Sequence, residues 1–440
     1  MKSKHVLLAL ALTFAAIINV YAGGGGQAAS GSAAKPGQKK VLRVMVWGST
    51  VQHNTYLTEF YKLYPDFAAK CTVEYIVGGA NDAECAEKMR LALVSGESIA
   101  DINHLNYTQV PEFARAGALS SLDSIIAPVR NDLLDGFRIL TEYEGKTVAV
   151  PSGIKPRIWF YLKDIFDQAG VDPTKVKTLD DFIAAGKKVQ ALNPKYKIWS
   201  LGPSDNTWMY SIAGTGSKFA DDKGNYLLTS DPNFAKVIEA FKKLKTSGVV
   251  ADYAAWTPDW EKAFADEVLV SYLSANWLSQ PQFLPKWAGE AQKGKWYAAQ
   301  WPSLIGETGG SDAGGGITVV PTYAAEPELA KEYLKLRYFT AEGYFLQQMI
   351  NFSTPPLMKS WVNDPRAKAP DAFIGGDYAG ETVKAIGDLK IFPYDPAAQL
   401  ELSIIVPHFD SAMNGVVSTD TALKNAQADL INQIGNPWTR

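Results

Sequence analysis

Histidine and cysteine are scarce in this chain of 440 residues, which contains four His and two Cys. The histidines are His5, His53, His104 and His408, and none belongs to an HExxH pattern or lies beside a CxxC pair. Protein-bound zinc and related metals need closely spaced nitrogen and sulfur ligands, so the sequence predicts no metal site. The chain also lacks a GxSxG nucleophile motif and a GxxxxGK[ST] phosphate loop. We therefore expect no cofactor, and no motif indicates catalysis.

Long apolar runs are missing except at the N-terminus. Val6–Val20 follows Lys2 and Lys4 and ends just before the small residue Ala22. This run is too short to span a bilayer comfortably and is typical of a secretory signal peptide over residues 1–22. Residues 23–40, rich in Gly, Ala and Ser, predict a flexible leader. No Cys follows the signal, so we expect a soluble periplasmic protein without a lipid anchor.

Basic residues are not in excess. The formal net charge is −3, and the signal peptide holds two Lys and no acid, so the exported chain carries about −3 − 2 = −5. A nucleic-acid partner is recognised through a basic stripe. The charge therefore argues against a nucleic-acid partner.

The two cysteines, Cys71 and Cys85, leave two alternatives open. An exported pair can form a disulfide. The predicted layout, however, places Cys71 at the start of a strand and Cys85 one turn into the following helix, near the far end of that strand. A disulfide needs Cα atoms within about 7 Å of each other. We therefore favour two free thiols.

The remaining sequence indicates an α/β protein with two domains, since 440 residues exceed one hydrophobic core. Strands and helices alternate from residue 41 onward, which predicts mostly parallel sheets flanked by helices. Ligands of such sheets bind at the carboxyl ends of strands. The segments predicted at those ends are Trp47–Thr50, Gly78–Asn81 and His104–Tyr107.

The stretch from Gly145 to Tyr161 organises the two domains. It predicts a strand over residues 146–150, a crossover interrupted by Pro151, Gly153 and Pro156, and a second strand over residues 157–162. A crossover between two lobes is where a hinge is expected, and a hinge implies a cleft. Lys155 lies on this crossover and is either a ligand contact or a solvated lysine.

Aromatic residues are plentiful, with 12 Trp, 20 Tyr and 19 Phe. An indole offers a flat apolar face to the CH face of a sugar, while Asn and Lys reach its hydroxyl groups. Core packing is the alternative for each Trp. The candidates at predicted loops and strand ends are Trp159, Trp208 (near Asn206), Trp256 and Trp277 (next to Asn276).

Several stretches in a fixed order resemble a known family. They include Gly145-Lys-Thr-Val-Ala-Val-Pro151, Tyr161-Leu-Lys-Asp-Ile-Phe-Asp-Gln-Ala-Gly170, Thr178-Leu-Asp-Asp-Phe182 and Ser274-Ala-Asn-Trp277. The chain is similar to the extracellular solute-binding proteins of ABC importers, of the carbohydrate-binding type that includes maltose-binding protein. The likeness covers nearly the whole chain from Val41 on.

The resemblance implies two discontinuous lobes with ligand between them. We expect lobe 1 to comprise residues 41–150 and 315–352, and lobe 2 to comprise residues 151–314 and 353–440. It further implies ligand contacts at Lys155, Trp208 and Trp277, and at Asn106 or Tyr107. The full set of expected ligand-binding residues is Trp47, Asn106, Tyr107, Lys155, Trp159, Asn206, Trp208, Trp256, Trp277, Gly314 and Gly315.

The implied function is capture of a sugar or oligosaccharide and its delivery to an ABC transporter permease by a monomeric receptor. One alternative is a secreted carbohydrate-active enzyme, which needs two carboxylates roughly 5 to 9 Å apart across the cleft. Neighbouring acids such as Asp259 and Glu261 are common in this chain, and we interpret them as solvated charges. Another alternative is a sensory or scaffolding binding protein.

Overall fold

The computed structural model describes residues 39–134, 140–153, 155–311, 316–350 and 355–387, with residues 389–439 completing the chain; the side chains of residues 348–350 are outside this description. No helix in these ranges combines the length and the apolar character needed to cross a membrane. The predicted signal peptide and most of the leader lie outside the described residues.

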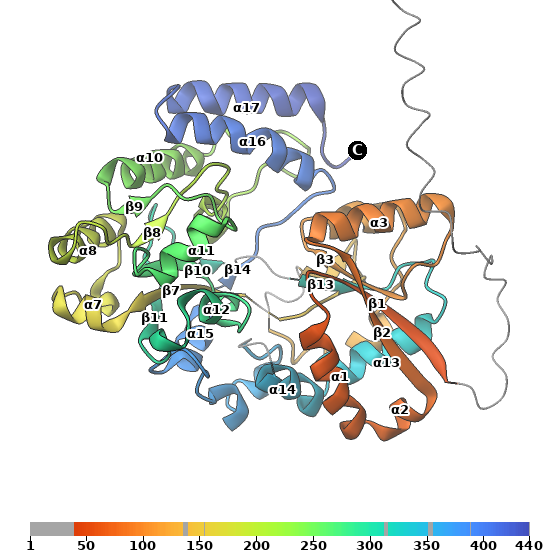
Figure 1. Ribbon diagram of the computed structural model, residues 1–440. Helices are drawn as coiled ribbons and strands as arrows, with labels where there is room; N and C mark the ends of the chain where they lie inside the picture. Colours follow the sequence, from red (N-terminus) through yellow and green to blue (C-terminus); the bar gives the residue numbers. More distant parts are fainter. Residues whose placement is uncertain are drawn as a thin grey trace, which may run out of the picture. The chain divides into compact units, whose positions relative to one another are not determined.

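A five-stranded sheet with the order β2-β1-β3-β13-β6 organises what we call the first lobe (Figure 1). β1 pairs parallel with β3, whereas β13 runs antiparallel to both β3 and β6. The elements of this lobe are β1 Lys40–Trp47, α1 Val51–Leu63, α2 Pro65–Lys70, β2 Cys71–Gly79, α3 Asp82–Ser95, β3 Ile102–Asn106, α4 Val110–Arg115, α5 Asp123–Ile126, β4 Glu142–Tyr143, β5 Lys146–Thr147, β6 Ala149–Pro151, β13 Gly316–Val319, α13 Pro327–Tyr338, α14 Ala341–Ile350, η4 Lys359–Trp361 and η5 Pro365–Lys368.

The side chains on the two faces of this sheet belong to two different hydrophobic cores. Val44 and Val150 point to one side, where they pack with residues of α1, α13 and α14. Ile317 and Val319 point to the other side and pack with residues of α3 and α4. Figure 1 accordingly shows α3 on one face of the sheet and α1 and α13 on the other. Side chains that alternate along a strand reach opposite faces, so each face carries its own core.

A three-stranded sheet, β10-β7-β11, organises the second lobe and its single large core. The elements of this lobe are β7 Arg157–Leu162, α7 Lys163–Gln168, η1 Pro173–Lys175, α8 Leu179–Leu192, β8 Trp199–Ser200, α9 Trp208–Thr215, α10 Pro232–Ser247, β9 Val250–Ala251, α11 Pro258–Ala265, β10 Ser271–Ala275, η2 Asn276–Ser279, α12 Leu284–Ala288, η3 Glu290–Gln292, β11 Trp296–Gln300, β12 Gly310–Ser311, α15 Tyr378–Ile386, β14 Leu389–Lys390, α16 Ala398–Met413 and α17 Thr419–Gln433.

The strand directions of the second lobe differ from the expected mostly parallel sheet. β7 is antiparallel to both β10 and β11. The next strand along the chain, β8, pairs not with β7 but with β9. Alternation of strands and helices along the chain permits parallel pairing, but it does not require that consecutive strands pair with each other. The prediction of a mostly parallel sheet was therefore wrong for this lobe. The α/β class and the two-lobed organisation are confirmed.

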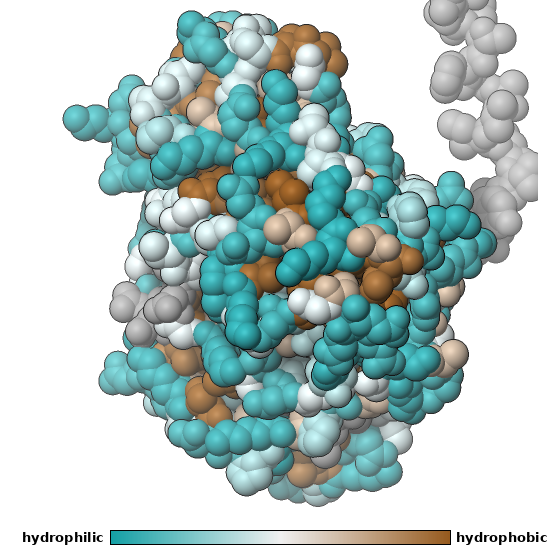
Figure 2. All heavy atoms as spheres, turned by 90° about the vertical axis from the view of Figure 1, so that its left-hand side faces the viewer, coloured by the Kyte–Doolittle hydropathy of each residue, from teal (hydrophilic) through white to brown (hydrophobic). Residues whose placement is uncertain are grey.

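The face shown in Figure 2, on the side of α7, α8 and α10, is mostly hydrophilic, with hydrophobic residues in small separate areas. Large exposed hydrophobic side chains are scattered over the lobes, for example Leu192 on α8 and Val94 on α3. Single exposed apolar residues are normal for a folded protein. Aromatic side chains that are exposed next to other aromatics are therefore the more informative exceptions.

Both cysteines are free and buried, as favoured from the sequence. Burial raises the pKa of the Cys71 thiol to about 12 and that of the Cys85 thiol to about 11. A thiol held in its neutral form is a poor nucleophile and a poor metal ligand. The two cysteines therefore behave as small core residues.

The boundary after α14 differs from the expected one. Leu357, Met358 and Ala367 belong to the core of the first lobe, although residues 353–440 were expected in lobe 2. The return to the second lobe takes place later, since Phe373 and Tyr378 belong to its core.

A further crossing follows β14, where neighbouring side chains enter different cores. Ile391 is buried in a core of the first lobe, and Phe392 is buried in the core of the second. Tyr394 packs against both, and its ring centroid lies 6.4 Å from that of Tyr107 in the first lobe. This segment therefore adds a contact between the lobes beside the predicted crossover.

Candidate functional site

A cluster of aromatic rings lies at the end of β10 in the second lobe. Trp256 is 57% exposed, and its indole stacks on that of Trp277 at a centroid distance of 5.7 Å and an interplanar angle of 25°. The ring of Phe283 packs edge-on against both, at 5.2 Å from Trp277 and 5.7 Å from Trp256. Trp260 and Trp287 lie beneath and are buried. We call the stacked rings of Trp256 and Trp277 the aromatic platform.

Local backbone features fix the platform. Trp256 has φ of 68°, a left-handed conformation that is unusual for a residue other than glycine, and it precedes α11, which is capped by Thr257. Trp277 lies in η2, directly after β10. The Asn276 amide donates a hydrogen bond of 2.9 Å to the carbonyl of Pro156 on the crossover. Strained backbone conformations persist only where the surrounding structure holds them, and they cluster at active and ligand-binding sites.

A polar loop, residues 202–206, packs against the segment that leads to Trp256. Gly202 leaves no room for a side chain, because a Cβ there would lie 2.3 Å from the Tyr253 carbonyl oxygen. Asp205 follows, and Asn206 is exposed. The carboxylate of Asp205 also contributes, after burial, to raising the pKa of Tyr272, whose ring lies 5.5 Å from that of Trp260. A carboxylate and an amide therefore lie in the neighbourhood of the platform.

Asp205 also supports a pH-dependent prediction. Burial raises its pKa to about 6, against the opposing effect of hydrogen bonds from the amide and hydroxyl of Thr207; of the surrounding charges, Asp410 also raises this pKa and Lys245 lowers it. Because this value exceeds the ordinary 3.8, the folded state binds the proton more tightly. The contribution of this proton to the free energy of unfolding is fully present below about pH 4 and is lost as the pH rises through about 6.

We expect Asp205→Asn to lose less stability than the wild type between about pH 4 and pH 7, measured by denaturant unfolding at a series of pH values. Asp420→Asn, an exposed change on α17, is the matched control and should keep the wild-type profile. Identical profiles for the wild type and Asp205→Asn would contradict the assignment.

Trp47, His53 and His104 lie close together in the first lobe: Trp47 is the last residue of β1, His53 lies in the first turn of α1, and His104 lies on β3, two residues before its end. All three are partly exposed. The His104 ring lies 5.9 Å from that of Trp47 and 5.7 Å from that of His53, both edge-on. Gly316 passes close to Trp47, since a Cβ there would lie 3.0 Å from the indole. Gly316 is also opposite Asn106 in the ladder, so Asn106 belongs to the same edge.

The Asn106 and Tyr107 turn is internally bonded. The Asn106 side-chain oxygen accepts from the amide of Thr108 at 3.2 Å, and the Asn106 amide donates to the side chain of Gln109 at 2.9 Å. Tyr107 is buried against Tyr394 of the second lobe. The turn thus offers Asn106, rather than the ring of Tyr107, at its exposed side.

Two side-chain hydrogen bonds join the lobes at this edge. Gln52 on α1 donates to Gln282 at 2.5 Å. Gln399 on α16 donates to the hydroxyl of Thr108. Gln52 precedes His53 and Gln282 precedes Phe283, so the first bond brings the histidines and the aromatic platform to neighbouring positions.

The crossover is fixed at both ends. On the first-lobe side, the amide and hydroxyl of Ser152 both donate to the Gly316 carbonyl, at 3.0 and 2.8 Å. On the second-lobe side, Arg157 donates to the Gly309 carbonyl at 2.9 Å and to Glu307 at 2.9 Å. Residues 153–156 and 310–315 are the chain between these two fixed points.

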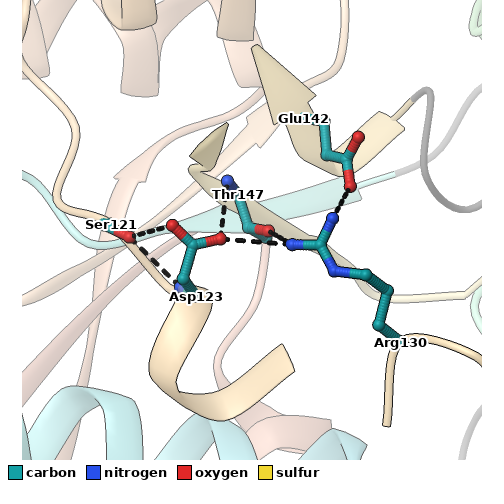
Figure 3. Close-up of polar contacts among 5 residues, drawn as sticks. All are labelled: Ser121, Asp123, Arg130, Glu142 and Thr147. Carbon is teal, nitrogen blue, oxygen red and sulfur yellow. Dashed lines mark hydrogen bonds and ion pairs between the residues drawn. The ribbon is translucent and has the colours of Figure 1, made fainter. Parts of the chain in front are cut away.

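A polar network fixes the strands that lead into this crossover (Figure 3). Arg130 donates to Thr147 at 3.1 Å and to Asp123 at 3.3 Å, and it pairs with Glu142 on β4. Ser121 donates to the other oxygen of Asp123 at 2.8 Å. The network fixes the position of β5, whose last residue lies two positions before the first residue of β6. It also explains why the expected strand over residues 146–150 divides into β5, paired with β4, and β6, paired with β13.

Trp159 and Trp208 do not fit the expected stacking role. Trp159 is fully buried on β7, where its Nε1 donates to Ser271 at 3.0 Å. Trp208 was expected in a loop but is the first residue of α9, fully buried with its ring 4.6 Å from that of Phe409. A ring packed on both faces cannot accept a sugar, so the core alternative holds for both.

Of the other predicted residues, Lys155 lies on the crossover and is 5% exposed. Gly314 and Gly315 lie outside the described residues. Trp47, Asn106, Asn206, Trp256 and Trp277 occupy the two faces described above, and their role in binding stays a prediction.

His53 and Asp205 are candidates that the sequence analysis did not name, and His104 appears there only as part of the strand-end segment His104–Tyr107, because isolated histidines carry no motif. His53 is brought to His104 only by the packing of α1 on the sheet. Among the described residues no group of three or more His, Cys, Asp or Glu is placed to hold a metal ion.

Comparison with known proteins agrees with this architecture. The family described as bacterial extracellular solute-binding protein matches residues 62–374. The arabinooligosaccharide-binding protein of Bacillus subtilis (strain 168) is 26% identical over 297 residues, which span 65% of this chain and 65% of that protein, just under two thirds. A protein of the same name from Halalkalibacterium halodurans is 25% identical over 365 residues, 77% of this chain and 78% of that one.

A solved structure shares the fold. The ABC transporter associated binding protein from B. animalis subsp. lactis Bl-04, in complex with beta-1,6-galactobiose, superimposes with a TM-score of 0.75 at 22% identity, covering 90% of this chain and 98% of that one. The family match extends over most of the chain and over both lobes. The chain therefore belongs to the bacterial extracellular solute-binding protein family.

Proposed function

We propose that the chain is an exported, monomeric receptor that binds a sugar or oligosaccharide between its lobes and delivers it to an ABC transporter permease. The observation that carries this proposal is Trp256, an exposed tryptophan with a left-handed backbone conformation, whose indole stacks on that of Trp277. Stacked indoles suit the CH face of a sugar ring. The names of the relatives, which bind arabinooligosaccharides and a galactobiose, support the same class of ligand.

In this proposal the sugar stacks on the outer face of Trp256, because Trp277 covers the inner face. From the second lobe, Asp205 accepts hydrogen bonds from the sugar hydroxyl groups, and Asn206 both accepts and donates them. Trp47, Asn106 and the two histidines contact the ligand from the first lobe. A ligand that contacts both lobes favours the closed arrangement by its differential affinity for it.

The crossover supplies the hinge of this mechanism. Ser152 with Gly316 on one side, and Arg157 with Gly309 on the other, hold the two ends. We propose residues 1–22 as a signal peptide and residues 23–40 as a leader, with the mature receptor in the periplasm.

A thermal-shift panel of mono- and oligosaccharides tests the proposal. A ligand that binds only the folded state raises the melting temperature as its concentration rises above the dissociation constant. We expect at least one oligosaccharide to produce a saturable shift. The same sugar incubated with the protein should be recovered intact. Accumulation of a cleavage product would favour the carbohydrate-active enzyme instead, and no shift with any sugar would contradict the receptor.

A further inference from the structure

Arg337 on α13 is a buried cation without a carboxylate partner among the described residues. It is 3% exposed. Its Nε donates to the side-chain oxygen of Gln347 at 3.0 Å, and one of its Nη atoms donates to the hydroxyls of Tyr75 and Tyr333, at 2.5 and 2.9 Å. Its guanidinium also lies 4.3 Å from the centroid of the Tyr56 ring. Every one of these partners is neutral.

The groups around Arg337 do not offset its charge. His53 stacks on Tyr75 at 4.7 Å and contacts His104 edge-on. Burial lowers the pKa of both histidines, that of His104 to about 3, and the positive charge of Arg337 lowers them further. Both imidazoles are therefore neutral near pH 7. Buried charges are normally paired, because an unpaired charge in the protein interior is strongly destabilising.

Two further polar groups at this end of the core lack a hydrogen-bond partner in the described part of the chain. They are the hydroxyls of Thr318 and Tyr338, both about 1% exposed. Thr318 lies opposite His104 in the β13–β3 ladder, so the two side chains share one face of the sheet. Native proteins leave few buried polar groups unpaired, and such groups call for an explanation.

This polar end of the core adjoins the proposed ligand site. Gln347, which accepts from Arg337, donates in turn to the Ser152 carbonyl on the crossover at 3.3 Å. A chain of contacts joins Arg337 to the partly exposed Trp47: Tyr75 accepts from Arg337 and stacks on His53, and His104 contacts both His53 and Trp47. The positive charge of Arg337 therefore lies near the two imidazoles, in a low-dielectric setting.

We propose that the first-lobe face formed by Trp47, His53 and His104 takes the carboxylate of an acidic sugar residue. This inference rests on the receptor function proposed above and narrows its ligand class to uronic-acid-containing oligosaccharides. The neutral imidazole of His104 has one N–H donor for the carboxylate. Arg337 is a positioning residue: its positive charge compensates the negative charge of the ligand carboxylate without contacting the ligand. A bound cation is disfavoured at the same place, because the positive charge of Arg337 acts on both imidazoles.

The experiment compares matched sugars by thermal shift and calorimetry: galacturonate and glucuronate oligosaccharides, each with its carboxyl-reduced, neutral counterpart. We expect the acidic member to bind roughly tenfold or more tightly than its neutral partner, as for a hydrogen bond to a charged group. His104→Phe keeps a ring but removes the N–H donor, and should abolish this preference, so that the acidic and neutral members of each pair bind with equal affinity. Arg337→Gln should do the same if it folds.

Arg366→Gln is the matched control, since it removes an arginine of the same lobe that is paired with Asp364. It should leave the preference intact. Equal or tighter binding of the neutral members overturns the inference but leaves the receptor function standing. An acidic preference that survives in His104→Phe also overturns it. The absence of any shift with every sugar, acidic or neutral, contradicts the proposed function and the inference with it.

Discussion

Replacing Glu307 by alanine is expected to lower the free energy of unfolding by about 3 to 5 kcal/mol, because it leaves the buried guanidinium of Arg157 without a counter-ion. Glu307 pairs with Arg157 at 2.9 Å, and the two side chains are 0% and 5% exposed. The second Glu307 oxygen accepts from the Ile305 amide at 2.8 Å and the Ser303 hydroxyl at 2.9 Å. Denaturant unfolding followed by tryptophan fluorescence measures the loss.

Glu332→Ala is the control for this prediction. Glu332 forms an ion pair of 2.7 Å with Lys70, but both side chains are well exposed. Exposed pairs contribute about 0 to 1 kcal/mol. A double change, Arg157→Met with Glu307→Leu, removes both charges and should restore much of the stability lost in Glu307→Ala. A loss below about 1 kcal/mol in Glu307→Ala would show that the pair is not buried as described.

Replacing Trp256 by alanine is expected to weaken sugar binding by about 2 to 4 kcal/mol, at least roughly thirtyfold in the dissociation constant. The exposed indole of Trp256 is the free face of the aromatic platform, whereas Trp277 supports it from behind. Calorimetry with the sugar found in the thermal-shift panel measures the change. Trp256→Phe should retain part of the affinity, because it keeps a smaller flat face.

Two comparisons make this result specific. Trp438→Ala changes a partly buried tryptophan near the C-terminus, whose Nε1 donates to the Asp221 carbonyl at 2.8 Å, and should not alter the affinity. Trp277→Ala should weaken binding less than Trp256→Ala, since it removes the support and not the contact surface. Unchanged affinity in Trp256→Ala would remove the platform from the site.

Local sequence signals predicted much of the secondary structure. Helical spacing from Val51, with Pro65 after Leu63, predicts a helix over residues 51–63, and Pro327 predicts the start of another that runs to Tyr338; α1 and α13 have these bounds. Thr178 followed three residues later by Asp181 predicts a capping box, and the two side chains form it at the start of α8. Such signals are readable because a few neighbouring residues determine them.

The elements that were missed depend on distant contacts. α16 contains Pro407 within its length, and the sequence analysis assigned no helix there. Its side chains Ile405 and Phe409 are buried in the core of the second lobe, and this packing outweighs the proline. The stretch from Trp199 to Tyr210 predicts a loop, yet α9 begins at Trp208.

The sequence names the candidate aromatic residues but not which of them are exposed. Aromatic residues near strand ends predict a sugar site, and the structure stacks two of the candidates, Trp256 and Trp277, on each other; their role in binding stays a prediction. Trp159 and Trp208 carry the same local signal and are core residues. Which indole is exposed depends on what covers it, and for Trp159 the cover comes from Phe166 and Phe182, which belong to α7 and α8.

The segment after β14 limits how the lobes can move. Ile391 and Phe392 are adjacent in the chain, yet each is embedded in a different core. Consecutive Cα atoms are about 3.8 Å apart across a trans peptide, so the lobes cannot draw apart at this point. Opening must therefore be a rotation whose axis runs close to the peptide bond between these two residues. Inserting a single glycine between Ile391 and Phe392 would allow the two lobes to separate at this point, while the crossover after β6 would stay unaltered.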